Sequence, residues 1–347
     1  MKNIVGVDIG GTKCAVVLGS YNCGKGKADG FVYESTADIT EPDIIIIDRI
    51  AFPTEIQKGF DYTLGKIAQN INEIINRNGI KINHLQGIGI SCGGPLDSKR
   101  GTILSPPNLY GWDNIPIVKV FEEKLGIKTK LQNDANACAL AEWRFGVARG
   151  YSHVIFLTFG TGMGAGLILN GRLYGGANDM AGEIGHVRLS ENGPVGYGKA
   201  GSFEGFCSGG GIAQLAKTKV LEKLQMGEKV SFCEAVDKLE DLNAKVIGDA
   251  AQAGDELARE IYRISGKYLG KGLSILIDIL NPEIIVIGSI FARSRNLLWP
   301  VACEEIKREC LSISLDKCKV VPAGLGEKIG DYAALAVAAY EDEGECL

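Results

Sequence analysis

The first third of the chain alternates short apolar runs with one amphipathic segment. Residues 3–9 are mostly apolar and end at Gly10-Gly11, and a second apolar run, Cys14 to Leu18, follows at once. Two such runs joined by a tight glycine turn predict a β-hairpin. Apolar residues within 62–78 recur at helical spacing up to Asn78-Gly79, which predicts an amphipathic helix.

The same signals extend along the rest of the chain. Strands are predicted at 44–47, 86–92, 129–132, 153–159, 167–169 and 283–288, with 49–52 pairing beside the first of them. Helices are predicted at 115–124, 134–145, 255–280 and 331–340. Residues 20–40 are polar and glycine-bearing, so we expect a loop or a hairpin extension there.

The order strand, glycine turn, strand occurs twice. Residues 4–18 contain it first, and residues 153–169 repeat it with a threonine again among the glycines. A repeated pattern predicts two lobes built on one plan, and ligands favour the cleft between such lobes. We expect an N-terminal lobe of residues 1–133, on which 330–347 packs back, and a C-terminal lobe of residues 134–329.

Composition narrows the class of protein. The chain has 347 residues, of which 46% are hydrophobic, and a net charge of −5, which argues against a nucleic-acid surface. Its ten cysteines include no CxxC pair, which is typical of a reduced compartment. No apolar run approaches the roughly 18 residues of a membrane span, and no signal peptide is evident. We therefore expect a cytoplasmic protein.

The first glycine turn carries candidate phosphate chemistry. Its sequence is Asp8-Ile9-Gly10-Gly11-Thr12-Lys13. Glycines let backbone N–H groups face a phosphate, Thr12 adds a hydroxyl donor, and Asp8 could hold Mg²⁺ through water. The alternative is an ordinary tight hairpin. The GxxxxGK[ST] pattern of a P-loop is absent.

The second glycine turn runs from Thr158 to Gly166 and contains Thr161 and Gly162. One such loop is weak evidence, because a bulged hairpin would look the same. Two such loops at corresponding points of two lobes predict a polyphosphate that is held from both sides.

Asp134 is the candidate general base. It lies in Asn133-Asp134-Ala135-Asn136-Ala137, where a predicted strand passes into a predicted helix. A carboxylate there could accept the proton of an attacking hydroxyl, with Asn133 hydrogen-bonding a sugar. The alternative is structural, because aspartate is a favoured helix N-cap.

Three further segments offer hydroxyl contacts. Glu183 and His186 lie in GEIGH, and Glu204 follows; carboxylates accept hydrogen bonds from vicinal hydroxyls. Asn108, near Trp112, could add one contact. The alternatives are a structural histidine at 186 and a simple turn at 108.

Together these motifs resemble the ROK family of sugar kinases and sugar-responsive repressors. The resemblance runs in order along nearly the whole chain. The matching stretches are DIGGTK, SCGGPLDSKRG, SPPNLYGW, NDANA with Glu142, TFGTGMGAGLILNGRLYGG, GEIGH, CSGGG, NPEIIVIG and LGEKIGDYAALA.

The resemblance implies an α/β, actin-like (ribonuclease-H-like) bilobal ATPase fold with two mixed-sheet domains around a central cleft. It implies transfer of phosphate from ATP, with Mg²⁺, to a hexose hydroxyl, usually the 6-hydroxyl, and many members are homodimers. Asp134 matches the family's catalytic base. The matching sugar contacts are Asn108, Asn133, Glu183, His186 and Glu204, and we place Gly94 of the GGPLD turn with them. The nucleotide side comprises Asp8, Gly10, Gly11, Thr12, Lys13, Thr161 and Gly162, with Gly288 at the adenosine.

One departure from the family is informative. Most members bind zinc with the GH histidine and three cysteines of a CxCGxxGCxE run. Here Val195, Tyr197 and Ser202 stand at the cysteine positions, and structural zinc needs about four ligands. We therefore predict no zinc, and expect apolar packing of Val195 and Tyr197 to hold Glu204 and His186. Ser289, where many members have glycine, is a smaller departure.

Rival functions remain open. A sugar-sensing repressor needs a DNA-binding segment ahead of the first glycine turn, where only seven residues precede Asp8. A sugar-binding protein without catalysis is a second rival, opposed by Asp134 and both glycine turns. Within the kinases, glucose is the leading substrate, and the alternatives are N-acetylmannosamine, N-acetylglucosamine, fructose and a β-glucoside.

Overall fold

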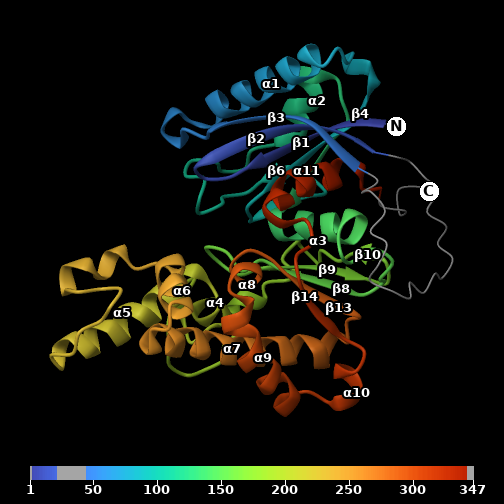
Figure 1. Cartoon of the computed structure of the whole chain (residues 1–347). Coiled ribbons are helices and arrows are strands. Elements are labelled where there is room, and N and C mark those ends of the chain that lie inside the picture. The colour runs from blue at the N-terminus through green and yellow to red at the C-terminus, as the bar shows by residue number, and fades with distance from the viewer. Residues whose placement is uncertain (1, 22–43, 342–347) are drawn as a thin grey trace. The chain divides into compact units, whose positions relative to one another are not determined.

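The computed structural model describes residues 2–21 and 44–341 (Figure 1). Most of the predicted loop at 20–40 therefore lies outside the described residues. The chain forms two compact units. The first comprises Met1–Ser152, Gly166–Ala181 and Gly324–Leu347, and the second His153–Ala165 and Gly182–Ala323. These units do not coincide with the predicted lobes, because residues 134–152 belong to the first unit; the predicted lobe division stays a prediction.

A five-stranded sheet organises the first unit. Its order is β3-β2-β1-β4-β7. The first three strands are antiparallel, whereas β1, β4 and β7 run parallel. The bounds are β1 Lys2–Ile9, β2 Lys13–Tyr21, β3 Ile44–Pro53, β4 Leu85–Cys92 and β7 Thr129–Asn133. The two strands predicted at 44–47 and 49–52 are one continuous strand, because the polar Asp48 and Arg49 continue the pairing with β2.

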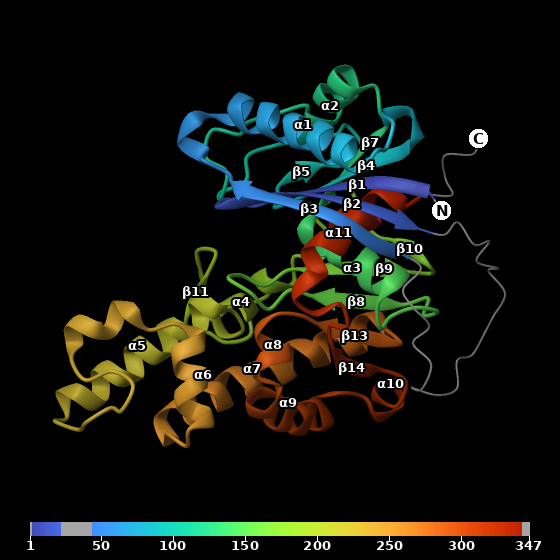
Figure 2. The same cartoon turned by 45° about the horizontal axis from the view of Figure 1, so that its top comes forward.

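Helices cover both faces of this sheet. In Figures 1 and 2, α1 (Phe60–Arg77) and α2 (Ile117–Leu125) lie on one face and α11 (Ile329–Ala339) on the other. Helix α3 (Asp134–Phe145) packs against α11. Short strands complete the unit: β5 Leu96–Asp97, β6 Thr102–Ile103, β9 Ala165–Leu169 and β10 Arg172–Leu173. The apolar stripe of α1, with Ile67 and Ile71, is fully buried on the sheet.

The register of the parallel strands sets the position of the candidate site. Ile9, at the end of β1, pairs with Cys92, at the end of β4, and Cys92 pairs with Asn133, at the end of β7. The carboxyl ends of all three strands therefore lie at one edge of the sheet. Ligands favour this edge in open α/β sheets. The residues that follow these strands are Gly10, Gly93 and Asp134, so the fold brings three of the sequence motifs together.

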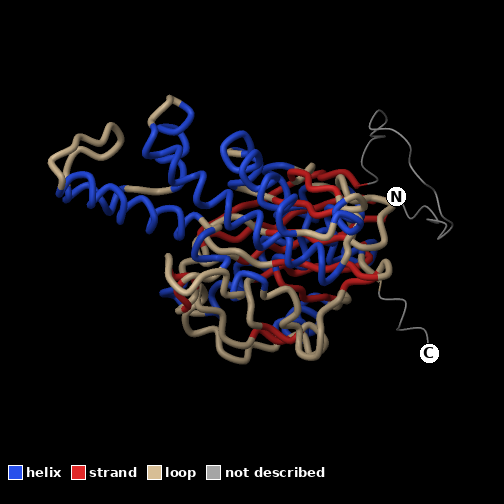
Figure 3. Tube along the Cα trace, turned by 90° about the horizontal axis from the view of Figure 1, so that it is seen from below, coloured by secondary structure: helices blue, strands red, loops and turns tan. Residues whose placement is uncertain are grey.

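The second unit contains a parallel group of strands and most of the helices. Strand β13 (Ile284–Ile287) pairs with β8 (Val154–Leu157) and with β14 (Lys319–Pro322). These strands belong to a second five-stranded sheet, whose order is β10-β9-β8-β13-β14. A small hairpin joins β11 (Val195–Gly196) to β12 (Lys199–Ala200). The helices, blue in Figure 3, are α4 Phe203–Phe206, α5 Gly209–Gln225, α6 Ala244–Gln252, α7 Glu256–Leu280, α8 Ile290–Arg293, α9 Arg295–Glu309 and α10 Ser312–Leu315.

Glycines in α7 allow close packing against α9. A Cβ atom at Gly266 would stand 2.7 Å from the Leu298 carbonyl oxygen of α9, and one at Gly270 would stand 2.7 Å from that of Ala302. A side chain at either position would push α9 away. Among the described residues, no helix is both long and apolar enough to cross a membrane.

Candidate functional site

Three carboxylates gather at the carboxyl edge of the first unit's sheet. Asp8 is the last residue but one of β1, Asp134 begins α3, and Asp331 lies in the first turn of α11. Burial raises the pKa of Asp8 to about 6, with further increases from the charges of Asp134 and Asp331. Lys13 and Arg49 oppose this rise. Like charges held together in this way mark a position where a cation or a proton is favoured.

Asp134 is the first residue of α3, and Asn133 is the N-cap. The Ala135 N–H donates to Asn133 Oδ1 at 2.9 Å and to Asp134 Oδ1 at 2.8 Å. Surrounding protein atoms raise the pKa of Asp134, partly offset by that N–H, although solvent still contacts the side chain. The cap therefore does not depend on Asp134 alone, which weakens the purely structural interpretation of this carboxylate.

The first glycine turn is held tightly from behind. The Gly10 N–H donates to the Lys13 carbonyl at 3.0 Å, and Thr54 Oγ1 donates to the Gly10 carbonyl at 2.6 Å. Thr12 and Lys13 are exposed. A Cβ atom at Gly11 would stand 2.5 Å from the backbone oxygen of Asn108. The turn is thus rigid, and it presents its donors to solvent.

The predicted sugar contacts of the first unit adjoin this turn. Asn108 is exposed, and its side-chain amide lies against Gly93, where a Cβ atom would stand 3.3 Å from Nδ2. Next to it, a Cβ atom at Gly94 would stand 3.2 Å from Asn133 Nδ2. The structure therefore brings Gly94, Asn108 and Asn133 together with the glycine turn. Their predicted contacts with a sugar stay predictions.

A carboxylate from outside the second glycine turn, that of Glu204, lies against this turn. The Thr158 N–H donates to the Gly164 carbonyl at 3.0 Å, which closes a wider turn than the first. Glu204 Oε2 accepts the Met163 N–H at 3.0 Å, and a Cβ atom at Gly162 would stand 2.8 Å from the same oxygen. Glu204 therefore lies directly against the turn that contains Thr161 and Gly162.

The GEIGH segment packs on the same turn. A Cβ atom at Gly185 would stand 2.1 Å from the Met163 carbonyl oxygen and 3.3 Å from the Glu204 Cβ atom. Glu183 and His186 are exposed on either side of this buried glycine. The second unit thus brings the predicted residues Glu183, His186 and Glu204 to one surface.

The loop at the family's zinc position lacks zinc ligands. Val195 is 46% exposed and Tyr197 is 74% exposed, so neither side chain is buried in the metal's place as expected. The Tyr197 ring does contact the His186 ring. Ser202 Oγ instead accepts the Gly205 N–H at 3.1 Å and caps α4. Of the four positions, only His186 offers a zinc donor, so the residues present do not fit this metal. No cluster of three or more His, Cys, Asp or Glu suited to a metal occurs within the described ranges.

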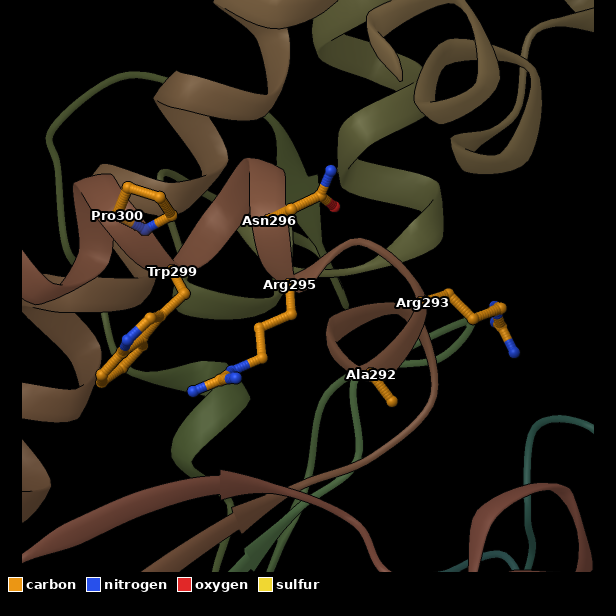
Figure 4. A pocket seen from close by; sticks show the side chains of 6 residues that line it. All are labelled: Ala292, Arg293, Arg295, Asn296, Trp299 and Pro300. Carbon is orange, nitrogen blue, oxygen red and sulfur yellow. The ribbon is translucent and has the colours of Figure 1, made fainter.

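Gly288 follows β13, at the carboxyl end of that strand. Its N–H donates to the Leu157 carbonyl at 3.0 Å, and the residue is buried. Ser289 has φ 55°, a left-handed value that favours glycine. A pocket of about 410 Å³ lies a few residues further on, and Figure 4 shows Arg293 and Arg295 pointing in different directions there. Its lining residues are Ala292, Arg293, Arg295, Asn296, Trp299 and Pro300.

The sequence reasoning missed three parts of this arrangement. Asp331 is distant in sequence, and only the structure brings it near Asp8. Thr54 anchors the first turn without any motif of its own. The GGG of CSGGG begins α5, with Ser208 as N-cap, and the Gly209 N–H donates to the Gly160 carbonyl at 2.8 Å. A serine before a helical run is a cap signal, which could have located this helix start.

Comparison with known proteins gives the class of this arrangement. The ROK family model matches residues 4–340. A glucokinase of Thermotoga maritima is 30% identical over 339 residues, which cover 96% of each chain. The crystal structure of a Streptomyces griseus ROK family glucokinase with glucose and AMPPNP has a TM-score of 0.69 at 27% identity, over 96% of this chain and 97% of that one.

Repressors are also among the similar proteins. The DNA-binding transcriptional repressor Mlc of Escherichia coli is 28% identical over 249 residues, which cover 72% of this chain and 59% of the repressor. The two sheets and these neighbours define an α/β protein of the actin-like ATPase fold, as predicted. The chain belongs to the ROK family, which confirms the resemblance drawn from its motifs.

Proposed function

We propose that this protein is an ATP-dependent hexose kinase with Asp134 as its general base. The observation that supports this most directly is the position of Asp134. Its carboxylate begins α3 at the carboxyl edge of the parallel strands, beside the first glycine turn, and solvent reaches it. A raised pKa makes a carboxylate a stronger base.

In the proposed reaction, the sugar hydroxyl gives its proton to Asp134 as its oxygen attacks the γ-phosphorus of ATP. The bond from that phosphorus to the bridging oxygen breaks, and ADP leaves. Asn108 and Asn133 position the sugar together with Gly94, and Glu183, His186 and Glu204 add further contacts. Phosphoryl transfer depends on such positioning and on charge stabilisation more than on covalent catalysis.

The phosphates are assigned to the two glycine turns. Gly11, Thr12 and Lys13 supply donors from the first unit, and Thr161 and Gly162 supply them from the second. Gly10 shapes the first turn, because its own N–H donates to the Lys13 carbonyl. The N-terminus of α5 follows in the second unit, and its backbone N–H groups are further candidate donors for phosphate. We place the adenosine near Gly288, where the pocket that contains Trp299 and Arg295 offers an aromatic ring and a cation.

Magnesium would accompany ATP. Asp8 is the residue to hold it, through water. Mg²⁺ commonly uses one or two carboxylates besides phosphates and waters, so one carboxylate is enough. The nearby Asp331 is engaged by Arg49, whose Nε donates to both of its oxygens at 2.9 Å. When bound, the ion offsets charge on the phosphates.

Glucose is the proposed sugar, since the relative of highest identity given above is a glucokinase. N-acetylmannosamine, N-acetylglucosamine and fructose are the alternatives. A reduced, cytoplasmic setting and a homodimer remain predictions. The direct test is ADP release from Mg·ATP over a panel of these sugars, with wild type and Asp134→Asn. Glucose-dependent release that Asp134→Asn abolishes supports the proposal. Full activity of Asp134→Asn, or no release with any sugar, overturns it.

A further inference from the structure

The loop that lacks zinc ligands is ordered by a different set of contacts. Residues Val195–Ser202 form a short hairpin, in which β11 pairs with β12. We call this segment the 195–202 hairpin. It precedes Glu204 closely and contacts GEIGH through Lys199 and Tyr197.

One side chain of α5, that of Gln214, hydrogen-bonds the first residue of this hairpin. Gln214 Oε1 accepts the Val195 N–H at 2.9 Å, and Gln214 Nε2 donates to the Val195 carbonyl at 2.8 Å. A primary amide can satisfy both backbone groups of one residue, as a neighbouring strand would. Val195 itself has a largely exposed side chain, so its backbone, not its isopropyl group, is what the protein holds.

The other end of the hairpin is tied to GEIGH. Lys199 Nζ donates to the His186 carbonyl at 2.8 Å. The His186 and Tyr197 rings meet edge to face, with centroids 6.3 Å apart. Ser202 Oγ caps α4, and Glu204, the second residue of that helix, accepts the Met163 N–H. Each of positions 186, 195, 197 and 202 therefore takes part in a contact that needs no metal.

We propose that Gln214 is a positioning residue for the sugar: it holds the 195–202 hairpin, which in turn fixes His186 and Glu204 in place of the family's zinc ion. This inference rests on the proposed function, because it assigns Gln214 to the sugar side of that site. Other bonds hold the far end of the hairpin, such as that from the Leu189 N–H to the Gly201 carbonyl at 2.8 Å. Without the clamp, the Val195 end would therefore be the part left to be ordered when sugar binds, and that ordering would weaken binding.

The test compares Gln214→Ala, Gln214→Glu and the control Thr218→Ala. Thr218 lies one turn further along α5, is exposed, and donates only to the Gln214 backbone carbonyl at 3.1 Å. We expect Gln214→Ala to raise the KM for sugar about three- to tenfold, with kcat and the KM for ATP within about twofold of wild type. Thr218→Ala should match wild type.

Hydrogen exchange distinguishes the two halves of the amide. Gln214→Glu keeps an acceptor for the Val195 N–H but loses the donor to its carbonyl. The Val195 amide should therefore exchange faster in Gln214→Ala than in Gln214→Glu. Equal sugar KM values and equal exchange in Gln214→Ala and wild type would overturn the inference.

Metal content gives an independent readout. Purified wild type should contain substoichiometric zinc, and dialysis against a chelator before Mg·ATP is added should leave its activity unchanged. Stoichiometric zinc, or activity that a chelator removes and zinc restores, contradicts the proposal. If wild type releases no ADP with any sugar, the kinase proposal fails, while exchange and zinc content still test the clamp.

Discussion

Each of the two glycine turns has a glycine at a position where a Cβ atom would clash, but the clashing atoms differ between the turns. At the first, Gly11 faces the backbone oxygen of Asn108, and the turn is anchored by Thr54. At the second, Gly162 faces the carboxylate end of Glu204, a side chain that can rotate. A contact with backbone cannot move aside, whereas a contact with a flexible side chain can. The first turn is therefore the more rigid of the two.

The carboxylates near the two turns also differ. Asp8, Asp134 and Asp331 lie together beside the first turn, and burial and mutual repulsion raise the pKa of Asp8. Glu204, beside the second turn, is held by the Met163 N–H. Concentrated negative charge suits a proton acceptor and a cation site, while a carboxylate bound to backbone suits recognition. Under the proposed function, the first unit would supply the proton acceptor and the cation site, and Glu204 of the second unit would serve recognition of the sugar.

The largest expected effect comes from Asp134. Asp134→Asn should lower kcat by about 10²–10⁴-fold, as for loss of a general base, with a small change in sugar KM. Steady-state ADP release measures both constants. Asp97→Asn, which removes a carboxylate of the same unit that accepts the Arg100 N–H, is the control. A large rise in KM with unchanged kcat would move Asp134 from chemistry to binding.

Asp8 should make stability depend on pH. Its pKa is about 6 in the folded state against an ordinary value of 3.8, so between these values the folded protein binds a proton that the unfolded chain has released. Stability should therefore fall as pH rises from 3.8 to 6 and then level off. At pH 7 the cost is at most about 3 kcal/mol.

Asp8→Asn should remove that dependence. Urea unfolding at several pH values measures it: the variant should gain on wild type as pH rises through this range, and the two should converge below it. Curves that stay parallel over the whole range would show that Asp8 titrates alike in both states.

Another pair of variants compares the two glycine turns directly. Gly11→Ala should destabilise the protein by about 1–3 kcal/mol, because its Cβ meets backbone. Gly162→Ala should destabilise the protein less than Gly11→Ala does, because its Cβ meets the end of a side chain that can move. Glu204 would then give up its hydrogen bond from the Met163 N–H, so the variant should raise sugar KM. Urea midpoints and sugar titrations report the two effects. Equal stability losses would contradict the contrast drawn between the turns.

The smallest expected effect has the opposite sign. Ser289→Gly should raise the free energy of unfolding by up to about 1 kcal/mol, since it relieves a left-handed backbone at φ 55°. Thermal unfolding measures it. The neighbouring Ser294→Gly, at a position with negative φ, should destabilise instead and serves as the comparison. A loss of stability in Ser289→Gly would mean that its side chain supplies more than strain.

Local sequence signals predicted the helices that combine hydrophobic periodicity or strong helix formers with a capping residue. Helix α3 spans 134–145 as predicted, because a polar Asn-Asp pair precedes a run of strong helix formers. The helix predicted at 62–78 is α1, displaced by one or two residues. Helices α5 and α9 were not predicted, although Ser208 is a cap signal for α5. Helix α5 opens with three glycines, and α9 contains Pro300.

Candidate site residues could be predicted from the sequence where a local motif contains them. They could not be predicted where the fold brings together residues that are distant in sequence. Asp8 and Asp134 follow from residue type and position at strand ends. The approach of Asp331 to Asp8 depends on how α11 packs on β1, which no local pattern contains. The hydrogen bonds between Gln214 and Val195 likewise join a helix to a segment that is separate from it in sequence. Because Gln214 is an exposed polar residue, hydrophobic periodicity could not have predicted its partner.

Glu204 uses one oxygen on the Met163 N–H, which leaves its other oxygen for a ligand. A hydroxyl that engages that second oxygen would steady the same turn on which we place the triphosphate. Nucleotide and sugar should then favour each other's binding by an equal factor, as thermodynamic reciprocity requires. An enzyme with this coupling would bind ATP weakly in the absence of a sugar acceptor. It would therefore hydrolyse little ATP without transferring the phosphate to sugar.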